Sequence, residues 1–471
     1  MFVGREAELR TLEDLYERAA QGFQMLVVYG RRRVGKTALL QRFSAGKPAL
    51  FFAAQQQADV DNLRDFTHVV AARYDLPDTT PPFATWEDAL GFVAKRAAGE
   101  HLVFVFDEFP YAAEASPGLP SALQIAIDHA FLQTDSLMIL CGSNQGFMES
   151  KVLGEKSPLY GRRSAQMKLR PFDYLDAARL LPDCTPQERV SYYAAFGGTP
   201  YYLRALEGSA TFEQNVTRLF FQDTGLMYGE PMMLLRQELR DPSTYSSVLR
   251  AIAGGATRAN TIADQAHVQT SSITAYLRNL CDLGIVERAV PHGEPERSKK
   301  SIYRVADPAF AFWFRFVAPF ATAVESGLGE QVAARVLGDQ RRATYEGHVF
   351  ERVCRQWVVR QARARALPLM VTTVDSWWGT DPVARQTCDV DVVASDDFGK
   401  EDVLVGECKW RESFDESDAL ETLRERAPLV GDYERRWYYV FSKWPAGETS
   451  LRKAETMGDV QFVSAGEMYE G

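Results

Sequence analysis

The sequence predicts an α/β protein of several domains, and three observations carry this prediction. An apolar strand pattern at 25–29 runs through a glycine-containing loop into a helix pattern at 36–43. From 171 to about 240 the pattern is helical, without a convincing buried strand. Two further strand patterns, 389–394 and 403–410, contain or end in charged residues. With 471 residues, the chain has the length of about three domains.

Composition excludes several classes of protein. At 46% hydrophobic and 25% charged residues, the chain is typical of a globular protein. No apolar run approaches the ~20 residues that span a bilayer, and the N-terminus does not resemble a signal peptide. Its six cysteines are scattered, which fits a reducing cytoplasm and suggests neither a zinc site nor a disulfide framework. A net charge of −10 argues against coating nucleic acid by bulk electrostatics but permits a local basic surface.

The strand–loop–helix at 25–43 carries the full G-x-x-x-x-G-K-T spacing of a phosphate-binding P-loop. Gly30 and Gly35 permit backbone conformations that a side chain would hinder, so the loop amides can point at phosphate oxygens. Lys36 supplies a charge to the outer phosphates of ATP, and the Thr37 hydroxyl can ligate Mg²⁺. The expected nucleotide-binding residues of the loop are Gly30, Arg31, Arg32, Arg33, Val34, Gly35, Lys36, Thr37 and Ala38.

Residues 2–6 precede an amphipathic helix pattern that reaches residue 19. They form either a simple helix entry or, as in AAA+-type ATPases that begin with this kind of box, a cover for the nucleotide base. We favour the second interpretation, which makes Gly4 and Arg5 nucleotide-binding candidates.

A continuous apolar strand at 101–106 ends in Asp107 and Glu108, the Walker B pattern. Asp107 is expected to hold Mg²⁺ through water, and Glu108 to orient the attacking water. After the next apolar strand, 137–141, Ser143 or Asn144 could contact the γ-phosphate or that water, and Asn144 enters the predicted catalytic set; a plain polar turn is the alternative. Arg162 or Arg163 could stabilise the transferred phosphoryl group in cis or in trans, or be ordinary surface arginines.

Residues 171–240 are predicted to form a helical lid, and 241–306 a winged helix. The latter contains helix patterns at 248–253, 260–266 and 271–280, followed by two strands around a polar tip. The helix at 271–280 would read DNA if this domain binds it, with Arg297, Lys299 and Lys300 as the basic cluster. Packing against protein is the alternative use of such a domain.

An aromatic-rich helical connector is predicted at 307–340, and a further α/β domain at 341–471. Strand periodicity places Glu407 and Lys409 on one face, and Asp391 lies on the strand before them. Two carboxylates can bind Mg²⁺, and the lysine can orient a water or steady developing charge. Glu351, or else Glu346, could complete the metal shell from the preceding helix, while Asp389 competes with Asp391.

On these motifs the chain resembles the archaeal-type ATPases, which also occur in bacteria and are related to AAA+ and STAND NTPases. The marks of the resemblance are residues 2–6, 30–37, 107–108, 160–162, 197–200, 303–316, and Asp391 with 407–410. It implies a P-loop ATPase joined to a winged helix and a PD-(D/E)xK nuclease-like domain, although the proline expected before the first aspartate is absent.

Two functions follow from this resemblance. The first is an ATPase, dependent on ATP and Mg²⁺, that gates a nuclease-like domain acting on DNA. The second is a signalling or scaffolding ATPase whose nuclease-like domain binds nucleic acid or protein without cutting. The expected partners are ATP, DNA and a second copy of the chain in a homo-oligomer, with no membrane.

Overall fold

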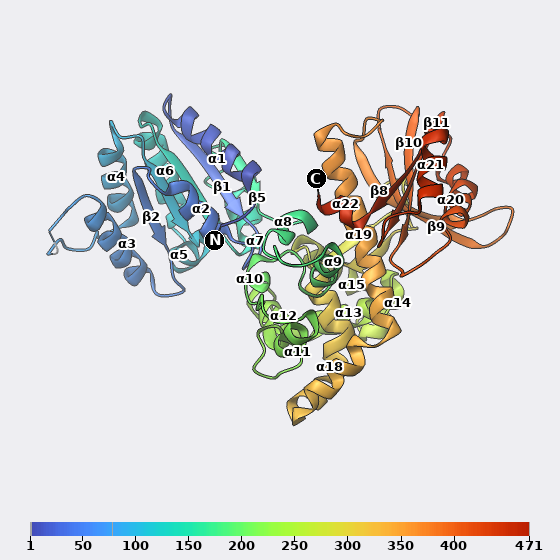
Figure 1. Ribbon diagram of the computed structural model, residues 1–471. Coiled ribbons are helices and arrows are strands. Elements are labelled where there is room, and N and C mark those ends of the chain that lie inside the picture. The colour runs from blue at the N-terminus through green and yellow to red at the C-terminus, as the bar shows by residue number, and fades with distance from the viewer. Residues whose placement is uncertain (1, 78, 471) are drawn as a thin grey trace. The chain divides into compact units, whose positions relative to one another are not determined.

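The computed structural model describes residues 2–77 and 79–470 and separates into two compact units, Met1–Pro171 and Phe172–Gly471 (Figure 1). The division falls one residue beyond the expected end of the ATPase core at 170. Within the described residues, no helix is both long enough and apolar enough to cross a membrane.

The first unit is built on a five-stranded parallel sheet with the order β2-β3-β4-β1-β5. Its strands are β1 Gln24–Tyr29, β2 Ala49–Ala53, β3 Val103–Asp107, β4 Leu137–Gly142 and β5 Ala165–Lys168. Every residue of β3 and β4 is buried, as expected for central parallel strands covered on both faces. Since β3, β4 and β1 are neighbours, the loops that follow them meet at one edge of the sheet.

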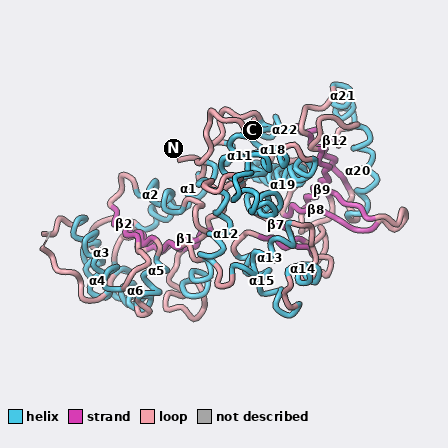
Figure 2. Tube along the Cα trace, turned by 90° about the horizontal axis from the view of Figure 1, so that it is seen from below, coloured by secondary structure: helices cyan, strands magenta, loops and turns pink. Residues whose placement is uncertain are grey.

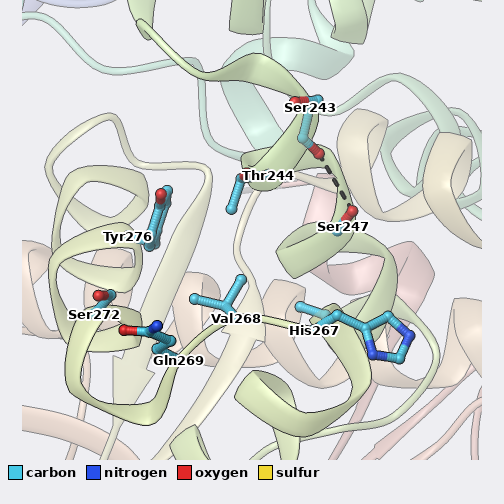
Figure 3. Close-up of a pocket in the computed structure, with 9 residues that line it drawn as sticks. Ser243, Thr244, Ser247, His267, Val268, Gln269, Ser272 and Tyr276 are labelled. Atoms are coloured by element: carbon cyan, nitrogen blue, oxygen red, sulfur yellow. Dashed lines mark hydrogen bonds between the residues drawn. The ribbon is translucent and has the colours of Figure 1, made fainter.

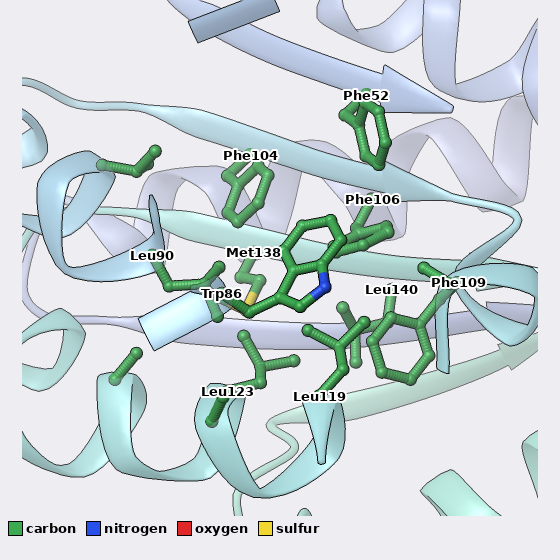
Figure 4. Close-up of a cluster of buried hydrophobic side chains, with 14 of the residues drawn as sticks. Phe52, Trp86, Leu90, Phe104, Phe106, Phe109, Leu119, Leu123, Met138 and Leu140 are labelled. Atoms are coloured by element: carbon green, nitrogen blue, oxygen red, sulfur yellow. The ribbon is translucent and has the colours of Figure 1, made fainter. Parts of the chain in front are cut away.

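Helices cover both faces of this sheet. Its helices are α1 Glu6–Ala19, α2 Lys36–Ser44, α3 Asp59–Arg73, α4 Trp86–Ala97, α5 Phe109–Ala115, α6 Leu119–His129 and the short α7 Gln145–Phe147. One core packs α1 and α2 against the sheet. The other joins α3, α4 and α6 to the opposite face through an aromatic cluster that includes Phe52, Trp86 and Phe106 (Figure 4). Burying each such ring contributes roughly 1.5–3 kcal/mol, which makes this sheet a rigid base for its loops.

The second unit begins with helices and a small hairpin. The helices are α8 Tyr174–Ala178, α9 Pro186–Phe196, α10 Pro200–Leu203, α11 Phe212–Phe220, α12 Leu226–Glu238, α13 Pro242–Ala253, α14 Ala259–Ala266 and α15 Thr270–Asp282. Strands β6 Val286–Ala289 and β7 Ile302–Val305 then pair antiparallel. The aromatic connector follows as α16 Pro308–Phe312 and short helical turns up to residue 328, and Phe310 and Phe312 within it are buried.

A mixed five-stranded sheet with the order β12-β11-β10-β9-β8 forms the end of the chain. Its strands are β8 Thr373–Thr380, β9 Thr387–Ser395, β10 Asp402–Lys409, β11 Arg435–Ser442 and β12 Val460–Ser464. Strands β8 to β10 are antiparallel, and β10 to β12 are parallel.

Helices α18 Gly329–Leu337 and α19 Gln340–Ala364 precede the sheet, and α20 Glu416–Val430, α21 Glu448–Met457 and α22 Ala465–Tyr469 follow its later strands (Figure 2). Helix α19 packs on one face, where Trp357 lies 5.7 Å from Phe441 between ring centroids. Helix α20 packs on the other face, where Leu423 joins Val393 and Val405 in a buried cluster.

The helices that begin the second unit are tied to its final domain. The Arg360 guanidinium on α19 binds both carboxylate oxygens of Asp173 at 2.6 and 2.7 Å. The buried Tyr345 hydroxyl donates to Ala194 O of α9 at 2.8 Å. These contacts explain why residues 172–240 cluster with the C-terminal sheet; the finer expected division at 240, 306 and 340 stays a prediction.

Candidate functional site

The loop between β1 and α2 has the backbone that the glycine spacing predicts. Gly30, Arg33 and Gly35 have positive φ values of 155°, 70° and 93°. A Cβ on Gly30 would lie 2.3 Å from Leu169 O, because Leu169 N donates to Tyr29 O at 2.7 Å and brings that segment close. Gly30 is therefore required by this close approach as well as by its backbone angle.

Lys36 is buried, with 5% of its surface exposed. Its ammonium donates to Gly30 O at 2.8 Å, Arg31 O at 3.1 Å and Ser143 Oγ at 3.0 Å. All three donors are satisfied by neutral acceptors, so the positive charge is held at the loop without a carboxylate to neutralise it.

Thr37 and Asp107 come together from α2 and the end of β3. The Thr37 hydroxyl donates to Asp107 Oδ2 at 2.7 Å, and Asp107 is 1% exposed. A hydroxyl beside a carboxylate is a donor set that suits Mg²⁺, which prefers oxygen ligands. The residues present therefore fit the metal that the P-loop pattern predicts.

Glu108 and Ser143 form the next contact at this sheet edge. Ser143 donates to the Glu108 carboxylate from its backbone N at 3.2 Å and from its hydroxyl. Ser143 and Asn144, the two candidates for a contact with the γ-phosphate or the attacking water, therefore have different partners in the structure. Ser143 bridges Lys36 and Glu108, whereas the exposed Asn144 accepts from Phe147 N at 3.0 Å and caps α7.

The predicted arginines lie in other contacts. The Arg162 guanidinium binds Asp128 of α6 through two hydrogen bonds of 2.7 and 2.8 Å, and this contact holds the pKa of Asp128 below its usual value. Arg163 donates to Leu153 O at 3.1 Å. In the described part of the chain, neither guanidinium hydrogen-bonds to a residue of the P-loop or to Glu108.

Arg5 contacts the phosphate loop itself. It is 7% exposed and has a left-handed backbone with φ 68°, following Gly4 at φ 67°. Its Nη2 donates to Val34 O at 3.1 Å and to Arg170 O at 2.6 Å. Arg5 therefore supports the backbone of the loop, a contact that the sequence did not indicate, while the place of residues 2–6 over the base stays a prediction.

Tyr111 of α5 is a second neighbour of the loop that the sequence did not indicate. Its hydroxyl accepts a hydrogen bond from Arg32, whose guanidinium carbon lies 5.8 Å from the Tyr111 ring centroid. No sequence motif marks this tyrosine, because only the fold brings α5 beside the loop.

A second cluster of polar side chains lies where β9 and β10 meet α19. Lys409 Nζ donates to Glu407 Oε1 at 2.6 Å, and Glu407 is 6% exposed. Asp391 Oδ2 accepts from Cys408 N at 2.8 Å. The antiparallel pairing of β9 with β10 ends at Val392 and Gly406. Asp391 and Glu407 are the next residues on the two strands, so they lie beside each other.

Glu351 is the helix carboxylate that faces this cluster. Burial first, then the negative charges of Glu351 and Glu407, raise the pKa of Asp391 well above its usual value. The other candidates lie elsewhere. Glu346 is buried against Arg342 at 2.6 Å and Trp410 Nε1 at 3.3 Å, and the Asp389 side chain is 68% exposed.

Cations already partner these carboxylates. Arg355 lies 3.9 Å from Glu351 and donates to Asp391 O at 2.7 Å, while Arg426 lies 3.9 Å from Glu407. Across residues 2–77 and 79–470, no three His, Cys, Asp or Glu side chains are arranged so that they could hold a metal ion. The donor types at 351, 391 and 407 suit Mg²⁺, but in this conformation they are not gathered around a common point.

A separate cavity of about 370 Å³ lies at the turn between α14 and α15 (Figure 3). Its lining is rich in hydroxyl groups and contains no Asp, Glu, Lys or Arg among the described residues: Ser243, Thr244, Ser247, Ala266, His267, Val268, Gln269, Ser272 and Tyr276. The cavity belongs to neither cluster of charged side chains.

Comparison with known families covers both units in part. Residues 2–206 match the family described as an ATPase domain predominantly from Archaea. Residues 313–421 match a family of archaeal and bacterial proteins of unknown function, and this range includes Glu351, Asp391, Glu407 and Lys409.

Among individual proteins, the chain is 29% identical over 449 residues to the uncharacterized protein MJECL04 of Methanocaldococcus jannaschii, a match that covers 94% of this chain and 96% of that protein. Among solved structures, the Walker-type ATPase PABY2304 of Pyrococcus abyssi aligns with a TM-score of 0.51 and 22% identity, covering 67% of this chain and 96% of that one. The ORC2 protein of Aeropyrum pernix aligns with a TM-score of 0.41 and 15% identity, over 71% and 95%.

The family match and the loop geometry agree. The first unit has the parallel sheet of the P-loop ATPases, with the glycine loop, lysine and strand-end carboxylate in one place. The chain is thus an ATP-hydrolysing enzyme.

Proposed function

We propose that ATP binding and hydrolysis in the first unit gate a Mg²⁺-dependent, nuclease-like site in the second unit that acts on DNA. One observation carries this proposal: Asp391 of β9 and Glu407 of β10 lie on neighbouring strands, Lys409 binds Glu407, and the charge of Glu351 on α19 acts on Asp391. Three carboxylates with a lysine are the groups that metal-assisted phosphodiester hydrolysis uses.

In the first unit, the residues present provide each part of ATP hydrolysis. The loop amides and Lys36 bind the phosphates, and the ammonium exchanges its carbonyl partners for phosphate oxygens. Thr37 and Asp107 would hold Mg²⁺, which would supply positive charge to offset the charge that develops on the phosphates. Glu108 orients the attacking water, while Ser143 hydrogen-bonds to both Glu108 and Lys36 and so fixes the positions of their side chains.

In the second unit, crowding of like charges supports a cation site. Burial, and after it the like charges of Glu351 and Glu407, raise the pKa of Asp391, and a bound cation would favour its charged form. Asp391, Glu407 and Glu351 would hold Mg²⁺, which polarises a phosphodiester. Lys409 would release Glu407 and orient the attacking water or steady the charge on the phosphate.

The remaining assignments belong to the same proposal. The three helices and hairpin at 241–306 are interpreted as a winged helix, whose basic tip at 297–300 contacts DNA phosphates. Arg162 acts on the transferred phosphoryl group, in cis or in trans, after leaving Asp128, and the chain forms a homo-oligomer. We place the protein in the cytoplasm.

The alternative is a signalling or scaffolding ATPase whose second unit binds nucleic acid or protein without cutting. One observation favours it: no metal-binding arrangement is assembled among the described residues, and Lys409 pairs directly with Glu407. A cleavage assay separates the two functions.

The test uses the full chain on single- and double-stranded DNA and RNA, with Mg²⁺ or Mn²⁺, with and without ATP. Wild-type protein should cut, and Asp391→Ala should lose cleavage while its ATPase rate stays within about twofold. Asp432→Ala removes an exposed carboxylate of the same unit and is the matched control. Equal cleavage by the Asp391 variant, or no metal-dependent cleavage on any substrate, would leave the non-cutting alternative.

A further inference from the structure

Arg304 of the hairpin lies beside the carboxylate cluster. In the register of β6 and β7, Glu287 is directly opposite Arg304, so the two side chains share one face of the hairpin. Glu287 Oε2 accepts from Arg352 Nη2 of α19 at 2.6 Å. That face is therefore turned toward the helical turn that carries Glu351 and Arg355.

A second contact fixes Arg304 from the side of the sheet. Its guanidinium carbon lies 5.4 Å from the ring centroid of Trp378 on β8. Trp378 is opposite Asp389 in the register of β8 and β9, two residues before Asp391. Arg304 thus lies between α19 and the segment of β9 that leads into the site.

The hairpin is held in this position at its other end as well. His292 N donates to Ser376 O of β8 at 3.0 Å. The buried His292 ring places Nε2 2.9 Å from Tyr433 Oη and 3.2 Å from Ser395 Oγ. Because the hairpin is anchored at both ends, Arg304 keeps its place beside Trp378 without a hydrogen-bonding partner for its guanidinium.

The guanidinium of Arg304 makes no hydrogen bond to any described residue. Its neighbours Arg352 and Arg355 each bind a carboxylate and a carbonyl oxygen, whereas no hydrogen bond or ion pair joins the Arg304 guanidinium to any residue in the described ranges. Burial and the charge of Arg355 lower its pKa, against the opposing effect of Glu351, Glu287 and Asp389. A partly buried guanidinium with five N–H donors and no acceptor is poised for an anion.

We propose that Arg304 is a substrate-positioning residue that binds a backbone phosphate of nucleic acid at the site formed by Glu351, Asp391 and Glu407. The site is then composite: α19, β9 and β10 supply the carboxylates, and the hairpin supplies the phosphate clamp. This inference rests on the proposed function and gives the hairpin a role in the site itself rather than only at its basic tip.

The test measures binding of a fluorescein-labelled oligonucleotide by anisotropy, with Ca²⁺ in place of Mg²⁺ to prevent cleavage. Arg304→Gln should weaken binding about tenfold and reduce the slope of log affinity against log salt by about 1. The oligonucleotide affinity of Arg304→Lys should lie between those of wild type and Arg304→Gln, because a lysine keeps the positive charge but lacks the forked N–H donors of arginine. Mn²⁺ binding, the ATPase rate and the unfolding temperature should not change.

Arg363→Gln is the matched control, since this exposed arginine lies on the same helix as Glu351, roughly 18 Å further along. It should bind the oligonucleotide as wild type does. If Arg304→Gln does not fold, the oligonucleotide affinity of Arg304→Lys is compared with those of wild type and Arg363→Gln instead. Wild-type affinity in the Arg304 variants, with Mn²⁺ binding lost in Asp391→Ala, would overturn this inference and leave the proposed function standing. A wild-type chain that binds neither Mn²⁺ nor the oligonucleotide would overturn both.

Discussion

The two sites of this chain both combine carboxylates carried by a sheet with a lysine, but the lysine has different partners in each. In the P-loop, Lys36 is satisfied by carbonyls and a serine, so the carboxylates of Asp107 and Glu108 keep hydroxyl partners. In the second unit, Lys409 pairs with Glu407 directly, and the negative charges of Glu351 and Glu407 act on Asp391.

The difference indicates what each site lacks. The P-loop holds a buried positive charge that no carboxylate neutralises, which suits an anionic ligand such as a nucleotide phosphate. The second site holds buried negative charges that repel one another, which suits a cation. Mutations should therefore affect nucleotide binding in one unit and cation binding in the other.

The largest expected effect is at Lys36. Lys36→Ala should lower ATP affinity more than 100-fold, because the buried ammonium expected to bind the outer phosphates is lost. Glu108→Gln should keep affinity within about threefold and lose turnover by about 10²–10³, since Thr37 and Asp107 remain. Equilibrium binding of a fluorescent ATP analogue and phosphate release measure the two. Lys95→Ala, on exposed α4 surface, is the control; unchanged affinity in Lys36→Ala would contradict the assignment.

Arg5 gives the next largest effect and tests what residues 2–6 do. Arg5→Ala leaves Val34 O and Arg170 O without their donor and should destabilise the first unit by on the order of 2–3 kcal/mol. Urea unfolding followed by a probe in that unit measures this. Weakened ATP binding with unchanged stability would show that Arg5 contacts the nucleotide and does not brace the loop.

The smallest effect concerns Asp391 in metal-free protein. Asp391→Asn should stabilise the chain by about 1 kcal/mol at pH 8, because it removes a charge that is disfavoured first by burial and then by Glu351 and Glu407. Folding raises this pKa, so the native state binds more protons than the unfolded state, and wild-type stability falls as pH rises from the ordinary carboxyl pKa to the raised one. Asp391→Asn should not show this loss of stability with rising pH, because asparagine does not titrate. Thermal unfolding at pH 5 and pH 8 tests the sign, with Asp432→Asn as control.

The sequence predicts the P-loop well because its chemistry is local. Gly30 to Thr37 are contiguous, and backbone geometry alone brings Lys36 to the loop carbonyls. Alternation could not decide between Ser143 and Asn144, since adjacent residues after a strand point in directions that only the following turn determines.

The second site depends on segments far apart in the chain. An irregularity between Asp375 and Trp377 shifts the pairing of β8 with β9, so strict alternation could not separate Asp389 from Asp391. Both Glu346 and Glu351 lie on α19, and only packing against Trp410 assigns the first to the core. No motif indicates Arg304 either, because its neighbours come from α19 and β8.

The central claim is that the second unit binds a divalent cation on its own. The most direct measurement is a calorimetric titration of nucleotide-free protein with Mn²⁺, using Thr37→Ala to silence the P-loop metal position. We predict that this variant binds one Mn²⁺ per chain and that adding Asp391→Ala or Glu407→Ala abolishes the binding. Mn²⁺ binding that persists without Asp391 and Glu407, or no binding in the Thr37 variant, would contradict the account.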